Sequence, residues 1–255
     1  MSYDRRERIR LLLEKQEIVT IKELEKEFPD VSSMTIRRDL ESLESMGQAI
    51  RIRGGARTVR HFPGSAEAVY AMRAVENPEG KAKIARLAVE YIETGRSVYF
   101  DAGTTVMALA KITPDLNLSI LTSAPNVALE LVQRYNPTVN LIGGVLSRTN
   151  LALSGVQSFE MVKNFNIDIA FVVPSAFSIE SGFSCGNQGE CELKRAIIKK
   201  ARRRILLIDS GKFDKNLPFT FAKLSEVDLV LTDREPDGKF LEEFEKRGVA
   251  LRFPK

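Results

Sequence analysis

The pattern of apolar and polar positions changes near residue 80 of this 255-residue chain. Beyond that point, short apolar runs are separated by segments whose apolar residues recur every three or four positions. The runs predict strands at 97–103, 118–121, 139–142, 167–173, 205–209 and 229–232. The segments between them predict helices at 81–91, 106–111, 126–134, 154–165, 190–201 and 239–247. Apolar strands between amphipathic helices indicate an α/β fold, with a parallel sheet covered on both faces.

The first 60 residues follow the helical period only in short pieces, which predicts three small helices and a hairpin. The first helix is expected at 4–15. The second opens at "TIKELEKEF", where Thr20 and Glu23 fit a capping box, and it ends at Pro29. After the third helix, "AIRIRGGARTV" alternates apolar and basic residues about a Gly-Gly pair, which is typical of a hairpin.

The third helix carries the pattern of a DNA-reading helix. It begins with Ser32 or Ser33 as N-cap and stops at Gly47. Ile36 and the leucines four and seven positions later form its apolar stripe, which turns the arginine pair "RR" sideways or outward. A helix-turn-helix presents this part of its second helix to the DNA major groove, and the basic hairpin beside it would form a wing.

Arginine pairs with guanine or phosphate, and the serines at the helix start suit a backbone phosphate. The alternative is a solvated charged helix beside a charged loop. The helix pair, the serine cap and the basic wing together favour DNA. The DNA contacts expected from the sequence are Ser32, Ser33, Thr35, Arg37, Arg38, Arg51 and Arg53.

Composition and charge limit the classes of protein to which this chain can belong. The formal net charge is only +4, but residues 48–60 contain arginines and no acid, a local charge that phosphate backbones attract. No apolar run approaches the ~18 residues of a membrane span, and the charged start "MSYDRRERIR" is unlike a secretory signal, so a cytoplasmic protein is expected. Cys185 and Cys191 are expected to be reduced thiols, and with one histidine, His61, no metal site is predicted.

A second candidate site follows the strand in "YFDAGTTVMALA". Gly103 allows a tight turn, and Thr104 and Thr105 offer hydroxyl and N–H groups at the positive end of the next helix, which suits a phosphate or carboxylate. Asp101 at the strand end could accept hydrogen bonds from sugar hydroxyls. The alternative is a Gly-Thr-Thr turn that only caps its helix. "LTSAPN" and "LIGGVL" also end predicted strands, and ligands of parallel sheets gather at the carboxyl ends of strands.

These pieces together resemble the DeoR family of bacterial transcriptional regulators. "TIRRDL" and "RIRGGA" resemble its winged helix-turn-helix, and "DAGTT", "LTSAPNVALEL", "LIGGVLSRT", "ELKRAII" and "LLIDSGKFDK" resemble its C-terminal sensor domain in order. The resemblance implies a sensor domain similar in fold to ribose-5-phosphate isomerase and CoA transferases. It also implies a repressor that binds operator DNA and a phosphorylated sugar or related metabolite, assembles as a dimer or tetramer, and uses no cofactor.

By this resemblance the expected effector contacts are Asp101, Gly103, Thr104, Thr105, Ser123, Asn126, Gly143, Lys194 and Lys212. The expected domains are the winged helix-turn-helix at 1–60, a linker at 61–79 and the α/β sensor domain at 80–255. One departure follows the strand at 167–173, where the chain reads "PSAFSIESGFSCGNQGE". Pro174 and Phe177 are expected there to reshape the floor of the pocket.

Two alternatives remain at this stage. The first is a sugar-phosphate isomerase with an added DNA-binding domain, which would need a carboxylate base over the sugar. "PSAF" has no acid where the isomerases have an acidic cluster, which leaves Glu192 as the candidate base. The second is a winged helix that binds another protein, against which the basic wing argues. We therefore predict a regulator with no catalytic residues.

Overall fold

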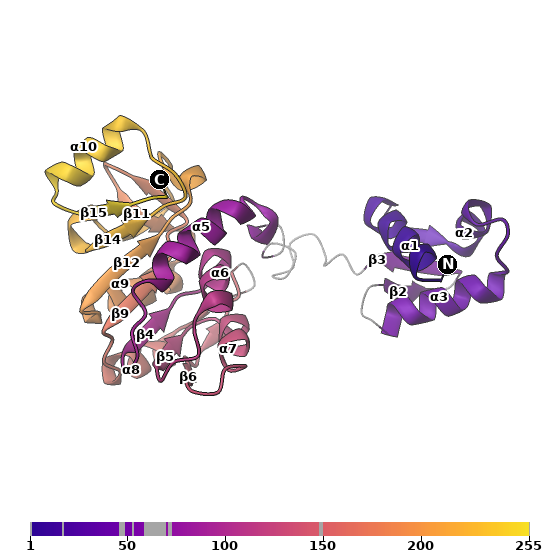
Figure 1. Cartoon of the computed structure of the whole chain (residues 1–255), viewed down its shortest axis with the longest axis horizontal. Helices are drawn as coiled ribbons and strands as arrows, with labels where there is room; N and C mark the ends of the chain where they lie inside the picture. The colour runs from indigo at the N-terminus through magenta and orange to yellow at the C-terminus, as the bar shows by residue number, and fades with distance from the viewer. Residues whose placement is uncertain are drawn as a thin grey trace. The chain divides into compact units, whose positions relative to one another are not determined.

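The computed structural model describes residues 2–16, 18–45, 49–52, 54–58, 70, 73–147 and 150–254. The chain divides into two compact units, Met1–Gly64 and Ser65–Lys255 (Figure 1). The first unit is a small helical domain with a three-stranded sheet. The second is an α/β domain that contains a seven-stranded sheet.

The first unit contains the three helices and the hairpin that the sequence predicts. Its elements are α1 (Ser2–Gln16), β1 (Ile18–Thr20), α2 (Ile21–Glu27), α3 (Ser33–Ser45), β2 (Ala49–Ile52) and β3 (Gly55–Thr58). The capping box of Thr20 and Glu23 is confirmed at the start of α2. Strand β1 was not predicted, and it pairs with β3 to give the antiparallel order β1-β3-β2. Ile36, Leu40 and Leu43 are buried, which confirms the apolar stripe of α3.

Two adjacent glycines shape the wing for different reasons. Gly54 has φ +89°, a left-handed conformation that side chains with a Cβ rarely adopt. Gly55 lies against β1, where a Cβ would come within 2.3 Å of the Val19 carbonyl oxygen. The tight turn and the close approach of β3 to β1 therefore both require glycine.

The second unit is built on seven parallel strands in the order β15-β14-β12-β9-β4-β5-β6. The strands are β4 (Ser97–Phe100), β5 (Ser119–Thr122), β6 (Thr138–Leu141), β9 (Ile169–Val172), β12 (Arg203–Leu207), β14 (Leu229–Leu231) and β15 (Ala250–Arg252). All six predicted strands are present, and only β15 was not expected. The predicted parallel sheet is confirmed.

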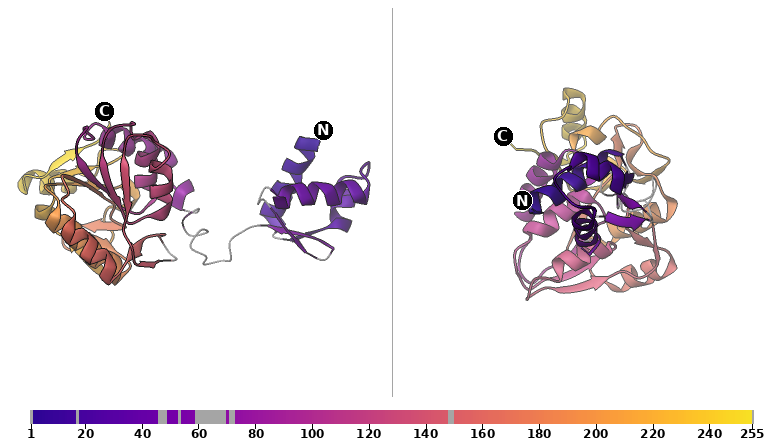
Figure 2. Two further views of the ribbon diagram at one scale, coloured as in Figure 1. Left: turned by 90° about the horizontal axis from the view of Figure 1, so that it is seen from below. Right: turned by 90° about the vertical axis from the view of Figure 1, so that its right-hand side faces the viewer.

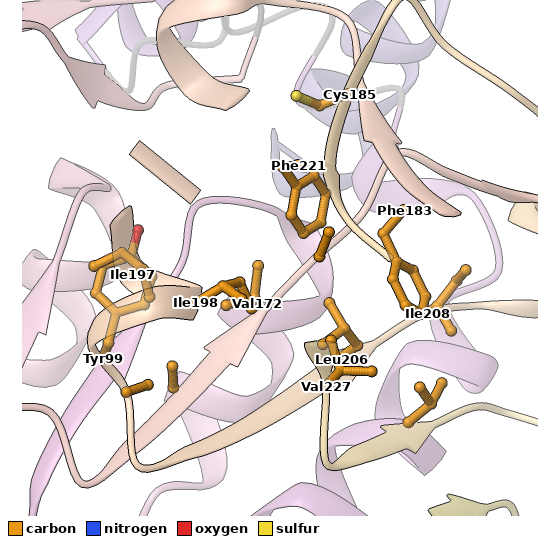
Figure 3. Close-up of a cluster of buried hydrophobic side chains, with 14 of the residues drawn as sticks. Tyr99, Val172, Phe183, Cys185, Ile197, Ile198, Leu206, Ile208, Phe221 and Val227 are labelled. Carbon is orange, nitrogen blue, oxygen red and sulfur yellow. The ribbon is translucent and has the colours of Figure 1, made fainter. Parts of the chain in front are cut away.

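Helices cover both faces of this sheet (Figures 1 and 2). They are α5 (Pro78–Val89), α6 (Thr104–Ile112), α7 (Pro125–Leu131), α8 (Val156–Asn164), α9 (Gln188–Lys200) and α10 (Gly238–Lys246). Successive strand residues point to opposite faces, so Val98 and Phe100 pack with α5, α6 and α7. Tyr99 packs with α8, α9 and α10, in the cluster that Figure 3 shows. Cys185 and Cys191 belong to this second cluster as free, buried thiols.

The segment after β9 forms a small antiparallel sheet that was not predicted. Its strands are β10 (Ala176–Ser178), β11 (Gly182–Cys185) and β13 (Phe219–Ala222), and a separate hairpin pairs β7 (Val145–Leu146) with β8 (Leu153–Ser154). Phe177 is fully buried, with its ring centroid 4.5 Å from that of Phe183, and it also contacts Phe240 and Phe244. The expectation that Phe177 shapes the pocket floor is therefore wrong, because the small sheet turns its ring into the core.

No described helix is both long enough and apolar enough to cross a membrane.

We predict that Phe177→Ala destabilises the second unit by about 3–5 kcal/mol, because it empties the centre of an aromatic cluster. Urea unfolding followed by circular dichroism measures the effect. Ile179→Ala is the matched control, since this residue of the same segment is 41% exposed and should change stability little. Equal effects of the two substitutions would contradict the central position of Phe177.

Candidate functional site

The exposed face of α3 is the candidate DNA-reading surface of the first unit. Arg37 and Arg38 are exposed, and among the described residues neither has a hydrogen-bond or ion-pair partner. The acid that follows them, Asp39, is 6% exposed and instead pairs with Arg5 of α1. The helix therefore directs the side chains of "RRD" to two sides. The guanidinium groups of Arg37 and Arg38 are exposed, and the carboxylate of Asp39 contacts α1.

The start of α3 is fixed by hydroxyl groups. Ser32 precedes the helix, and its Oγ accepts a hydrogen bond from the Thr35 N–H at 3.3 Å and lies 3.0 Å from the Thr35 hydroxyl oxygen. Ser32, rather than Ser33, is therefore the cap. The Ser33 hydroxyl donates to Glu25 of α2, which joins the two helices of the motif. These contacts orient the helix start, where backbone N–H groups remain available to a phosphate.

Arg51 of the wing is held by α3. Its guanidinium donates to Glu44 at 2.9 Å and to Glu41 at 2.5 Å, and its own N–H donates to Glu44 at 3.1 Å. These carboxylates hold the pKa of Arg51 above its usual value. The sequence suggests that Arg51 contacts DNA, whereas the structure gives it the position of a tie between wing and helix. Arg53 lies outside the described residues.

The second unit contains a cavity of about 640 Å³ at the carboxyl ends of β4, β9, β12 and β14. Parallel sheets bind their ligands at this edge. Its lining is rich in charged and polar groups: Arg73, Glu76, Asn77, Lys81, Thr104, Asn150, Ser175, Glu190, Asp209, Ser210, Lys212, Lys215, Asp233 and Arg234. Such a lining suits a polar, anionic ligand.

A buried ion pair lies at the base of this edge. The Lys194 ammonium donates to the Asp101 carboxylate and, at 2.7 Å, to the Val173 carbonyl, and it lies 3.2 Å from a Glu190 oxygen. Lys194 is 1% exposed and Asp101 is 2% exposed. Burial alone would lower the pKa of Lys194, but the carboxylates of Asp101 and Glu190 outweigh it and raise that pKa above its usual range. The lysine therefore stays charged.

The Asp101 carboxylate is fully engaged by the protein. One oxygen accepts from the Ala102 N–H at 2.8 Å and the Tyr99 hydroxyl at 3.3 Å, and the other from the Val173 N–H at 2.9 Å and from Lys194. The sequence suggests that Asp101 receives sugar hydroxyls. The structure instead makes it the group that joins β4, β9 and α9.

The remaining predicted effector residues are three that line the cavity, Thr105 next to them in sequence, and three that lie away from the lining. Gly103, Thr104 and Lys212 line the cavity. Thr105 follows in the first turn of α6, where its hydroxyl is buried without a partner among the described residues. The structure does not bring the others to the cavity lining: Ser123 lies 3.0 Å from the Tyr99 hydroxyl, Asn126 is in α7, and the Gly143 carbonyl accepts from Ser158.

Several lining residues were missed in the sequence. Glu190 lies one turn before Lys194 on α9, a spacing that could have identified it. Asp233 follows β14 as Asp101 follows β4, and it accepts from the Ser210 N–H at 2.6 Å. Burial tends to raise the pKa of Asp233, but hydrogen bonds from Asn77 and Ser210 outweigh this and lower it. Arg73 and Lys81 precede β4, and no motif in the sequence around them indicates a ligand site.

The isomerase alternative assigns the catalytic base to Glu192, which the structure does not place at the cavity. Glu192 is exposed on α9 and accepts a hydrogen bond from Gln188 at 3.1 Å, and it does not line the cavity. Glu190 does line it, but its carboxylate contacts Lys194 and accepts from Asn150 at 2.7 Å. The proposal of Glu192 as a base is therefore wrong, because the helix turns this residue to solvent.

The comparisons with known proteins cover both units. Residues 5–61 match the "DeoR-like helix-turn-helix domain" and residues 76–234 match the "DeoR C terminal sensor domain". The HTH-type transcriptional regulator GlpR of Haloferax volcanii is 38% identical over 221 residues, 86% of each chain. The HTH-type transcriptional repressor GlcR of Bacillus subtilis is 34% identical over 223 residues, 87% of this chain and 84% of that protein. A solved ribose 5-phosphate isomerase from Methanocaldococcus jannaschii shares 15% identity over 54% of this chain and 55% of its own, with a TM-score of 0.41.

We predict that Lys194→Met destabilises the second unit by about 3–5 kcal/mol, because it leaves the Asp101 carboxylate buried without its counter-charge. Adding Asp101→Asn to the same chain should recover part of the loss, since residue 101 then carries no buried charge that needs a counter-charge. Urea unfolding of the single and double variants measures both effects. A double variant no more stable than Lys194→Met alone would contradict the ion pair as the source of the loss.

Proposed function

The chain belongs to the DeoR family of helix-turn-helix transcriptional regulators, and from that premise we propose that it represses a carbohydrate or polyol catabolic operon and is released from DNA by a phosphorylated sugar-type effector. Similar relatives carry the names of regulators and repressors, among them a putative aga operon transcriptional repressor. The enzyme alternative has no support among these names.

The exposed face of α3 supports DNA binding. Arg37 and Arg38 are not neutralised by any described carboxylate, and Ser32 caps the helix start beside them. We propose that Arg37, Arg38 and Thr35 face bases or phosphates of the operator, and that Ser32 and Ser33 lie near its backbone. Arg51 acts by holding the wing against α3.

One observation carries the choice of effector. The N-terminus of α6, with Gly103 and Thr104, opens into the same cavity as Lys81, Lys212 and Lys215. A helix N-terminus and several ammonium groups together suit a phosphate. Asn150, Ser175 and Ser210 line the same space and can bond sugar hydroxyls. We propose that the phosphate lies at Gly103 and Thr104, beside Lys212, with Asp101 and Lys194 supporting the site from below.

Release requires an effector that favours the state with low DNA affinity, because a ligand that binds both states equally changes nothing. We further propose a two-fold assembly of this chain. It would present two copies of α3 about one DNA turn, ~34 Å, or a multiple of it apart, and would read a repeated half-site.

A thermal-shift panel of sugar phosphates tests the effector proposal, with the parent sugars as matched controls. An effector at ~100 times its Kd should add ~2.7 kcal/mol of stability, while the unphosphorylated sugar should add little. NMR of the same samples should find the ligand chemically unchanged. A ligand that is chemically converted would support the enzyme alternative. A panel in which no sugar phosphate stabilises the protein would contradict the assignment of the cavity as the effector site.

We predict that Arg38→Ala weakens operator binding by about 1–3 kcal/mol and leaves the fold intact, because the side chain is exposed and contacts DNA. Fluorescence anisotropy with labelled operator measures the affinity. Lys199→Ala removes the same charge from an exposed position on α9 and should bind as the parent protein does. Equal affinities of both variants would remove Arg38 from the interface.

A further inference from the structure

The segment that leads into α5 forms part of the cavity wall. We call residues 73–77 the strap; Arg73, Glu76 and Asn77 of it line the cavity. The strap follows shortly after Gly64, the last residue of the first unit, so it is the part of the described cavity wall that is nearest in sequence to the DNA-binding unit.

The strap is held by groups that also face the ligand space. The Arg73 carbonyl accepts a hydrogen bond from the Lys81 ammonium and another, at 3.5 Å, from the Thr104 hydroxyl. The same ammonium donates to the Glu76 carbonyl. Lys81 and Thr104 both line the cavity, and Lys81 is only 5% exposed. The Arg73 carbonyl is thus bonded to the same ammonium and hydroxyl that a phosphate at the start of α6 would contact.

The far end of the strap is fixed independently of these donors. Asn77 has φ 45°, a left-handed conformation, and its side chain accepts from the Gly80 N–H at 3.1 Å. Its amide nitrogen donates to Asp233 at 3.1 Å. Asn77 is therefore a fixed point beside α5, and loss of the bonds to the Arg73 and Glu76 carbonyls would loosen the part of the strap that precedes it.

Replacing the two carbonyls by a phosphate as partner of the Lys81 ammonium is favourable on chemical grounds. A buried ammonium needs hydrogen-bond partners, and it forms stronger bonds with a phosphate oxygen than with a neutral carbonyl.

We propose that the phosphate of the effector displaces the Arg73 and Glu76 carbonyls from Lys81 and Thr104, and that ligand binding thereby releases the strap. The inference rests on the proposed phosphate position in the cavity. It names Lys81 as the residue through which occupancy of the cavity alters the strap.

Hydrogen exchange with inorganic phosphate as the probe tests the proposal on the full chain without requiring the effector or the operator. Saturating phosphate should speed exchange of the strap amides about tenfold, because the bonds that hold the Arg73 and Glu76 carbonyls are lost and the segment opens more often. Lys81→Met should show the fast exchange already without phosphate. Lys83→Met is the matched control, since Lys83 is exposed on the same helix, and it should behave as the parent protein does.

Thermal shift and unfolding curves of the same samples separate the outcomes. Phosphate that binds but leaves strap exchange unchanged or slower overturns the proposal, and so does a protein that binds no phosphate. A cooperatively folded Lys81→Met protein with the slow exchange of the Lys83→Met control also overturns it. If strap exchange responds to phosphate while no sugar phosphate alters operator affinity, the strap inference stands and the proposed function fails.

Discussion

The buried pair of Asp101 and Lys194 is the interaction on which the second unit depends. A charge in the interior is unfavourable unless it is paired and hydrogen-bonded, and here each partner meets several groups. Asp101 accepts from Ala102, Tyr99 and Val173 as well as from Lys194. These bonds connect the ends of β4 and β9 with α9. The glycine-threonine turn follows Asp101 directly, so its position is set by the same pair.

Carboxylates within the chain decide which basic groups remain available to ligands. In the first unit, Asp39 holds Arg5 and the glutamates of α3 hold Arg51, whereas Arg37 and Arg38 stay exposed. In the second, Lys194 is committed to Asp101. Lys212 lies 3.3 Å from Asp209 but keeps a place on the cavity wall. Both candidate sites thus keep basic groups accessible beside ion pairs within the chain.

Local pattern predicted most of the fold, because periods of two and of about three and a half positions mark strands and helices directly. It missed β10, β11 and β13, whose pairing of Phe183 with Ala222 joins segments that share no local signal. The same limit applies to the cavity. "DAGTT" is one continuous turn and was found, but Arg73, Lys81 and Asp233 meet it only after folding. Lys194 was expected at the ligand, and its partner Asp101 was read as a sugar contact, because a sequence does not reveal that the two satisfy each other.

In the proposed mechanism, the donors that hold the strap are the donors offered to a phosphate. Linkage then requires that effector and operator weaken each other equally. The most direct test measures operator affinity with and without a saturating sugar phosphate, and the affinity for that sugar phosphate with and without operator. The account predicts that both affinities fall by the same factor, about 5–150-fold. An operator affinity that is unchanged when the cavity is saturated would contradict it.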